Sequence, residues 1–107
     1  MRIKVRTVDQ EYAKQNLEEN KNIILLDVRT VEEYKEIHIP GSILIPLDEI
    51  TKENMEKKIP DKQALIYIHC RSGGRSKIAY GLLRELGYTN MYDIGGINTW
   101  SYETERG

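Results

Sequence analysis

The sequence predicts an α/β layered fold with a mostly parallel sheet, because short apolar runs alternate with segments of helical periodicity along the chain. Two of these runs, 23–26 and 64–68, are apolar or aromatic at every position, which is typical of strands buried on both faces of a parallel sheet. The segment after residue 75 repeats apolar residues on one helical face. It is followed by Gly87, where a left-handed C-terminal cap belongs.

The individual elements can be placed from the same patterns. We expect strands at 3–5, 23–26, 42–45, 64–68 and 91–94, with 3–5 at an edge of the sheet and 64–68 near its centre. We expect helices at 8–20, 30–37, 48–58 and 75–86. Thr7 with Gln10, and Thr30 with Glu33, stand at capping-box positions for the first two helices. The side chains expected to turn inward from the second and last helices are Val31, Tyr34, Ile78, Ala79, Leu82, Leu83 and Leu86.

The composition indicates one globular domain over residues 1–107. The 16 basic and 17 acidic residues give a net charge of −1, so we predict no strongly basic face and no nucleic-acid partner. No apolar run approaches the roughly 18 residues that span a bilayer, so we expect no membrane partner. The single cysteine, Cys70, excludes an internal disulfide and has no companion ligands for zinc. We therefore expect no metal ion, no other cofactor and a reducing, cytoplasmic location.

The chemistry converges on Cys70, which stands between the strand at 64–68 and the helix that starts near Arg75. Ligands of open parallel sheets lie beyond the carboxyl ends of the strands, and this loop follows such an end. The backbone N–H groups of a short glycine-containing loop, the start of the helix, and the charges of Arg71 and Arg75 would all favour a thiolate over a thiol. We therefore expect the pKa of Cys70 to lie below the free value of about 8.5.

A loop of this kind would suit a cysteine persulfide and an anionic sulfur donor as well as a thiolate. No second cysteine is present to resolve a disulfide, so Cys70 could pass an outer sulfur only to a molecule outside the chain. This favours a transferase over a disulfide reductase. The alternative is an inert, buried cysteine. That role would not need the two arginines and two glycines found at 71–75.

Five other conspicuous residues are more easily explained by structural roles. His69 should point away from the neighbouring cysteine, and His38 lies beside a Pro-Gly turn. Asp27 and Arg29 are expected to form an ion pair that fixes neighbouring loops, and Trp100 is expected to anchor packing. A general-base role for His69 and a direct substrate role for the Asp27 and Arg29 pair stay open as lesser alternatives.

Three motifs resemble those of the rhodanese-like family, the thiosulfate sulfurtransferases and their relatives. The first comprises 26–34 and 38–42, the second is 70–76, and the third is Gly95-Gly96 followed by Trp100. Together they extend over nearly the whole chain, in the family's order. One departure is Ile37, since the family commonly has glycine just before the histidine.

The resemblance implies a mostly parallel five-stranded sheet flanked by helices on both faces, with Cys70 as the catalytic persulfide carrier. The residues that it implies for holding the substrate and the sulfur are Arg71, Ser72, Gly73, Gly74, Arg75 and Ser76. Phosphatases of similar fold place five residues between cysteine and arginine, whereas four lie between Cys70 and Arg75. The shorter loop favours a single sulfur atom over a phosphate group.

We therefore expect a sulfurtransferase of the thiosulfate sulfurtransferase type. Its reaction would move a sulfane sulfur from thiosulfate, or a similar small anionic donor, to a thiol or to cyanide. The main alternative is a persulfide carrier or binding module that serves a thioredoxin-like protein or another sulfur-acceptor protein. A phosphatase-like enzyme is a weaker alternative.

Overall fold

The structure, a computed structural model, describes residues 3–107, and these include four strands in one fully parallel sheet. The strands are β1 (Ile24–Asp27), β2 (Ile43–Leu44), β3 (Ile66–Cys70) and β4 (Met91–Gly96), in the order β2-β1-β3-β4. All five residues of β3 are buried, which confirms the predicted interior strand. Its last residue, Cys70, is paired with Gly96 of β4, after a shift in register between Ile68 and Cys70. The carboxyl ends of these two strands are therefore neighbours.

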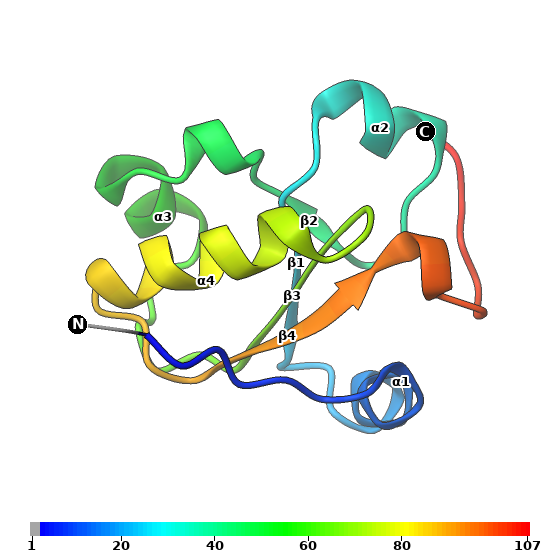
Figure 1. The fold of residues 1–107 in the computed structure, drawn as a ribbon, viewed down its shortest axis with the longest axis horizontal. Helices are drawn as coiled ribbons and strands as arrows, with labels where there is room; N and C mark the ends of the chain where they lie inside the picture. The colour runs from blue at the N-terminus through cyan, green and yellow to red at the C-terminus, as the bar shows by residue number, and fades with distance from the viewer. Residues whose placement is uncertain (1–2) are drawn as a thin grey trace.

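Helices flank the sheet on both faces (Figure 1). They are α1 (Gln10–Glu19), α2 (Val31–Glu36), α3 (Lys52–Lys58) and α4 (Gly74–Glu85), with single 3₁₀ turns at η1 (Leu47–Glu49) and η2 (Ile97–Thr99). On one face Ala13 of α1 and Trp100 belong to one buried apolar cluster. On the other face Met55 of α3 and Leu83 of α4 belong to a second cluster. The sheet therefore separates two cores, as the layered fold predicts.

The predicted fifth strand at 3–5 is not formed, so the described residues contain a four-stranded sheet and not a five-stranded one. The N-terminal segment does pass β4, but it pairs there only through an isolated parallel bridge between Thr7 and Asp93. The Arg6 guanidinium donates to the carbonyl of Thr89 at 2.6 Å. A side chain thus binds the backbone where a longer strand would have paired.

Only one of the two predicted capping boxes is formed. Thr30 and Glu33 form the predicted capping box at the start of α2. α1 begins later than predicted, because the Asp9 carboxylate, and not Thr7, accepts the capping hydrogen bond at 2.8 Å. The helix predicted at 48–58 is divided into η1 and α3, since Thr51 caps a new helix at Lys52.

α4 buries a face that is rotated from the predicted one. Its buried side chains are Ser76, Ala79, Tyr80 and Leu83, at helical spacings of three and four. Ile78 is instead 57% exposed, and Val31 of α2 is 41% exposed, so both predictions of burial were wrong. Gly87 has φ +100°, as predicted for the residue that ends this helix. The rotation matters for the site, because it turns Ser76 toward the cysteine.

Candidate active site

Cys70 lies at the junction of β3 and α4, and only three residues separate the strand from the helix. Gly73 closes this tight connection in a left-handed conformation, with φ +107°, which a residue with a side chain rarely adopts. Its N–H donates to the Cys70 sulfur at 3.0 Å. The sulfur-bearing residue is only 1% exposed, so the donors around it have little competition from water.

Two opposing effects act on the Cys70 thiol. Burial raises its pKa, because a thiolate loses hydration inside the protein. The backbone N–H and the hydroxyl of Ser76, with the N–H groups of Gly73 and Ser72, favour the thiolate and together outweigh the burial. The pKa of Cys70 is therefore lowered, as expected from the sequence.

The two arginines of the loop have different surroundings. Arg75 donates to both carboxylate oxygens of Glu33 in α2, at 2.7 and 2.9 Å. Hydrogen bonds from Arg75 are the main reason why the pKa of Glu33 falls to about 2. The charge of Arg75 is thus largely balanced by Glu33. Arg71 is exposed, is in no ion pair among residues 3–107, and lines a hollow of about 200 Å³ beside Asn98.

The loop is packed against the end of β4. A Cβ on Gly96 would collide with the Arg71 carbonyl and would lie 2.6 Å from the Cα of Ser72, so only glycine allows this approach. The Arg71 carbonyl also accepts a hydrogen bond from the Asn98 N–H at 3.0 Å. The Gly95-Gly96 motif was conspicuous in the sequence, and one of its two glycines is thus required by contact with the loop.

The other conspicuous side chains occupy the structural positions that were predicted. Asp27 and Arg29 form a buried ion pair at 2.8 Å, and the same guanidinium donates to the Ile37 carbonyl at 2.7 Å. His38 bonds to the Tyr34 carbonyl at 2.9 Å and to Glu105 at 3.0 Å.

His69 is fully buried beside Asp27, with its Nε2 at 3.7 Å from that carboxylate and without a hydrogen-bond partner. Burial lowers the pKa of His69, which favours the neutral imidazole. Trp100 is 8% exposed within the α1-side cluster. These two residues are therefore part of the scaffold around the site.

Two residues close to this site, Asp93 and Lys77, were not given a role from the sequence. Ser76, which the resemblance implies among the residues that hold the sulfur, lies 3.7 Å from the Cys70 sulfur and donates to the Asp93 carboxylate of β4 at 2.7 Å. Lys77 binds the other oxygen of Asp93 at 2.8 Å. The one available signal was the position of Asp93 near the carboxyl end of a strand.

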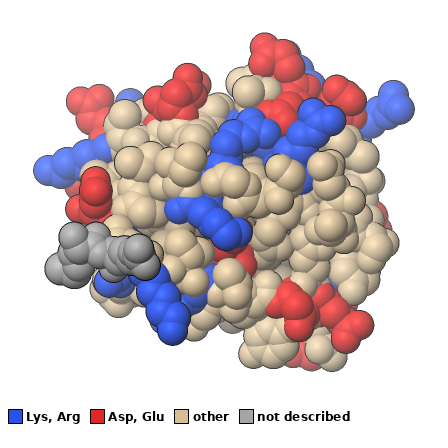
Figure 2. All heavy atoms as spheres, viewed as in Figure 1, with Lys and Arg blue, Asp and Glu red and all other residues tan. Residues whose placement is uncertain are grey.

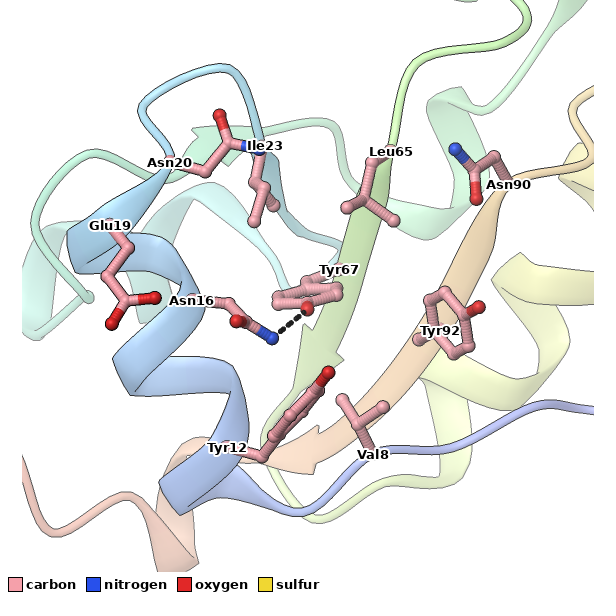
Figure 3. A pocket seen from close by; sticks show the side chains of 10 residues that line it. All are labelled: Val8, Tyr12, Asn16, Glu19, Asn20, Ile23, Leu65, Tyr67, Asn90 and Tyr92. Carbon is pink, nitrogen blue, oxygen red and sulfur yellow. Dashed lines mark hydrogen bonds between the residues drawn. The ribbon is translucent and has the colours of Figure 1, made fainter.

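A second, wider hollow does not belong to this site. It measures about 420 Å³ and is lined by ten residues from α1, the adjoining segments and the beginnings of β3 and β4 (Figure 3). Tyr12, Tyr67 and Tyr92 contribute its aromatic walls, and Asn16 donates to the Tyr67 hydroxyl at 3.0 Å. No residue of the loop 70–76 lines it. The candidate site is thus shaped by the loop itself and by the smaller hollow at Arg71.

The surface around the loop is mixed in charge. Figure 2 shows basic side chains gathered near the beginning of α4, with acidic side chains around them. Among residues 3–107, no three histidine, cysteine or carboxylate side chains form a group that could hold a metal ion. In the same part of the chain, no helix has the length and apolar character needed to cross a membrane.

The fold and the site thus define an α/β protein in which one inner strand of a parallel sheet ends in a cysteine whose neighbouring donors favour the thiolate. The comparison with known families is more specific. The chain belongs to the rhodanese-like domain family, whose model matches residues 9–103.

Solved structures and named relatives agree with this assignment. A rhodanese-like domain protein from Staphylococcus aureus is 31% identical, with a TM-score of 0.82 over 96% of this chain and 99% of that one. A structure described as "rhodanese with anions" from E. coli is 34% identical, with a TM-score of 0.73 over 79% of this chain and 99% of that one.

Two named relatives differ in their described roles. The thiosulfate sulfurtransferase PspE of Escherichia coli is 39% identical over 72 residues, which cover 67% of this chain and 68% of PspE. YrkF of Bacillus subtilis, named as a candidate sulfur carrier protein, is 35% identical over 99 residues, which cover 92% of this chain. The chain spans about half of the length of YrkF, 52%.

Proposed function

We propose that this protein transfers a sulfane sulfur through a persulfide on Cys70. The observation that carries the proposal is the buried sulfur of Cys70, which receives the Gly73 N–H at 3.0 Å and has the Ser76 hydroxyl nearby. A thiolate and a persulfide are both sulfur anions, so the same donors stabilise the group before and after it is loaded. An inert cysteine would not need these donors.

The proposed reaction has two displacement steps. The Cys70 thiolate attacks the outer sulfur of thiosulfate, a new S–S bond forms, and the S–S bond of the donor breaks with its electron pair leaving on sulfite. An acceptor thiolate or cyanide then attacks the outer sulfur of the persulfide. The bond to the Cys70 sulfur breaks, which restores the thiolate and releases the acceptor persulfide or thiocyanate.

Two observations support a small anionic donor. Arg71 is exposed at the edge of the hollow beside the loop, where its charge is available to an anion. PspE is named as a thiosulfate sulfurtransferase, and the E. coli rhodanese structure is described with anions. The four residues between Cys70 and Arg75 favour sulfur over phosphate, and a single free cysteine suits a reducing compartment such as the cytoplasm.

A second candidate is a persulfide carrier that takes its sulfur from a partner protein. The name of YrkF favours this reading, since most of this chain matches about half of that protein. In this reading Cys70 would use the same anion-stabilising loop but would react with thiosulfate very slowly. In both readings the acceptor can be a thiol, which a thioredoxin-like or sulfur-acceptor protein can present.

Intact-mass measurement tests the proposal directly, because Cys70 is the only cysteine. After treatment with thiosulfate, the mass should rise by one sulfur atom and return after cyanide is added, with thiocyanate released. Cys70→Ser should show neither change. Loading only from a persulfidated protein would support the carrier. Loading in Cys70→Ser, or no loading from either source, would overturn the proposal.

A further inference from the structure

A continuous chain of polar contacts links the buried cysteine to the protein surface. The Cys70 sulfur lies 3.7 Å from the Ser76 hydroxyl, and that hydroxyl lies 2.7 Å from Oδ1 of Asp93. Oδ2 of Asp93 is paired with Nζ of Lys77 at 2.8 Å. Ser76 and Asp93 are 0% and 2% exposed, whereas the Lys77 side chain is 56% exposed. These four residues come from β3, α4 and β4.

The Ser76 hydroxyl has one hydrogen and more than one possible acceptor. When Cys70 is a thiol, its S–H donates to the Ser76 oxygen and the Ser76 hydrogen goes to Asp93. When Cys70 is a thiolate or a persulfide anion, the sulfur has no hydrogen and accepts instead. The hydroxyl also lies 3.0 Å from the Gly73 carbonyl, so Ser76 can then bind the sulfur only by withdrawing its hydrogen from Asp93 or from that carbonyl. The Asp93 carboxylate is charged and closer, at 2.7 Å, so it is the main competitor of the sulfur for the one hydrogen.

Asp93 can release this hydrogen without becoming an unsatisfied buried charge. Its Oδ1 also accepts the Gly95 N–H at 2.9 Å, and its Oδ2 keeps the ion pair with Lys77. The positive charge of Lys77 partly neutralises the carboxylate of Asp93, which makes that carboxylate a weaker acceptor of the hydrogen bond from the Ser76 hydroxyl. The exposed Lys77 therefore influences whether the Ser76 hydrogen goes to Asp93 or to the Cys70 sulfur.

We propose that Asp93 and Lys77 are positioning residues, which set the direction of the Ser76 hydroxyl and thereby the readiness of Cys70 to lose its proton and react. Asp93 holds the hydroxyl in the direction that suits a thiol, and Lys77 moderates that hold. The proposal deepens the proposed function, because it explains how the same loop can hold Cys70 in two protonation states.

Other charged groups face this chain of contacts from neighbouring elements, and most of them are already paired. Arg75 of α4 is bound to Glu33 of α2, and Asp27 of β1 is bound to Arg29. His69 is buried beside Asp27, and burial lowers its pKa toward the neutral form. From the N-terminal segment, Arg6 lies over the Tyr92 ring and donates to the Thr89 carbonyl. The side chain of Arg71 is directed to the hollow at the loop's outer edge. None of these groups is altered in the variants below.

The proposal gives opposite signs for two single changes. Asp93→Asn removes the carboxylate charge and leaves a weaker acceptor, so the Ser76 hydroxyl turns to the sulfur more readily. Alkylation of Cys70 at mildly acidic pH should become roughly tenfold faster, as expected for one gained charge-assisted hydrogen bond. Lys77→Met leaves the carboxylate unpaired and a stronger acceptor, so alkylation should become severalfold slower. Ser76→Ala should remove most of both effects.

The experiment measures the rate of Cys70 alkylation by iodoacetamide against pH. Iodoacetamide is uncharged, so its approach is insensitive to the altered charges, and the single cysteine gives a single site. The variants are Asp93→Asn, Lys77→Met, Ser76→Ala and both combinations with Ser76→Ala. Lys14→Met on α1 is the matched control, because it also removes a lysine from an ion pair, with Glu18 at 2.7 Å, and should leave the profile unchanged.

The proposal is supported if Asp93→Asn makes alkylation faster at mildly acidic pH, if Lys77→Met makes it slower, and if both effects shrink in the Ser76→Ala background. Equal movements with and without the hydroxyl would overturn it, since the charges would then act on the sulfur directly. Unmoved profiles would show a merely structural role. If Asp93→Asn fails to fold, the cycle of Lys77→Met with Ser76→Ala decides alone, because Lys77 is exposed. No sulfur donor is used, so a failure of the proposed sulfur transfer would be seen separately.

Discussion

Glu33 of α2 holds Arg75 of α4 through two hydrogen bonds of 2.7 and 2.9 Å, and so joins positions 42 residues apart in the sequence. The same Glu33 closes the capping box with Thr30. One carboxylate therefore fixes both the start of α2 and an arginine of the loop 70–76. Replacing Arg75 should consequently disturb the fold as well as donor binding.

The Glu33–Arg75 pair should make stability depend on pH. Because the pKa of Glu33 is lowered from 4.5 to about 2, its stabilising effect is present above 4.5 and is lost as the pH falls toward 2. Glu33→Gln keeps a capping acceptor and removes the charge. Since the pair is partly exposed, the loss at neutral pH should be about 1–2 kcal/mol and should vanish at the acid end of this window. Urea unfolding at several pH values measures it.

The matched control for this change is Glu36→Gln, because Glu36 lies on the same helix, is exposed and is in no ion pair among residues 3–107. Its stability should differ little from that of the unchanged protein at any of these pH values. Equal losses in the two variants, or a loss in Glu33→Gln that persists at the lowest pH, would contradict a role for the ion pair.

Arg71 should affect the use of an anionic donor with little effect on stability. Its side chain is exposed and unpaired among residues 3–107, and one charge-assisted contact is worth about 1.5–3 kcal/mol. Arg71→Ala should therefore lower kcat/KM for thiosulfate about tenfold or more. The effect should shrink at high salt, because salt screens exposed charges.

Arg84→Ala provides the comparison for Arg71→Ala, since Arg84 is an exposed arginine near the far end of α4. Steady-state rates and urea unfolding are measured for both variants at low and high salt. If the two variants use thiosulfate equally well, the donor binds away from Arg71.

Gly96 should tolerate no side chain, because a Cβ there would collide with the backbone of Arg71 and Ser72. We expect Gly96→Ala to displace the loop, to reduce persulfide loading strongly and to cost about 1–3 kcal/mol of stability. Gly81→Ala in the middle of α4 meets only ordinary contact at 4.0 Å, and should stabilise the protein by about 0.5–1 kcal/mol. Thermal unfolding and intact-mass loading report both. Unimpaired loading in Gly96→Ala would contradict the tight contact.

Features encoded by near neighbours in the sequence were predictable. The Thr30 and Glu33 capping box spans three residues, and the amide donors around Cys70 come from the six residues that follow it. The contacts of Ser76 with Asp93 were not predictable, because they depend on the rotation of α4 about its axis. The apolar pattern alone favoured Ile78 for burial, where Tyr80 is buried instead.

The missing fifth strand has a similar explanation. The segment 3–5 has the alternating apolar character of an edge strand, and Thr7, shortly after it, forms a bridge with Asp93 of β4. Whether such a segment pairs depends on what else binds the partner backbone. Here the Arg6 side chain donates a hydrogen bond to the Thr89 carbonyl, and Thr7 forms an isolated bridge with β4. The periodicity of the sequence cannot predict whether a side chain or a backbone N–H will donate to a given carbonyl.

The lowered pKa of Cys70 should be visible in its reactivity. Although burial raises this pKa, the donors from Ser76, Gly73 and Ser72 lower it further than burial raises it. The thiolate should therefore persist below the free-cysteine pKa of about 8.5, and iodoacetamide should react quickly even at mildly acidic pH. Thiosulfate or another small anion that occupies the amide donors should slow this reaction. A midpoint at the free-cysteine value would contradict an activated nucleophile.

The same preparation separates sulfur from phosphate chemistry. Four residues between Cys70 and Arg75 leave the loop one amide shorter than the five-residue spacing of phosphatases, and Arg75 is already bound to Glu33. A phosphate group would need more donors than the loop offers, since each of its oxygens must be bound. Aryl phosphates should therefore be hydrolysed negligibly under conditions in which Cys70 is readily alkylated. Hydrolysis that is rapid and is lost in Cys70→Ser would show that the shorter loop still accommodates phosphate and that the preference for sulfur does not come from its length.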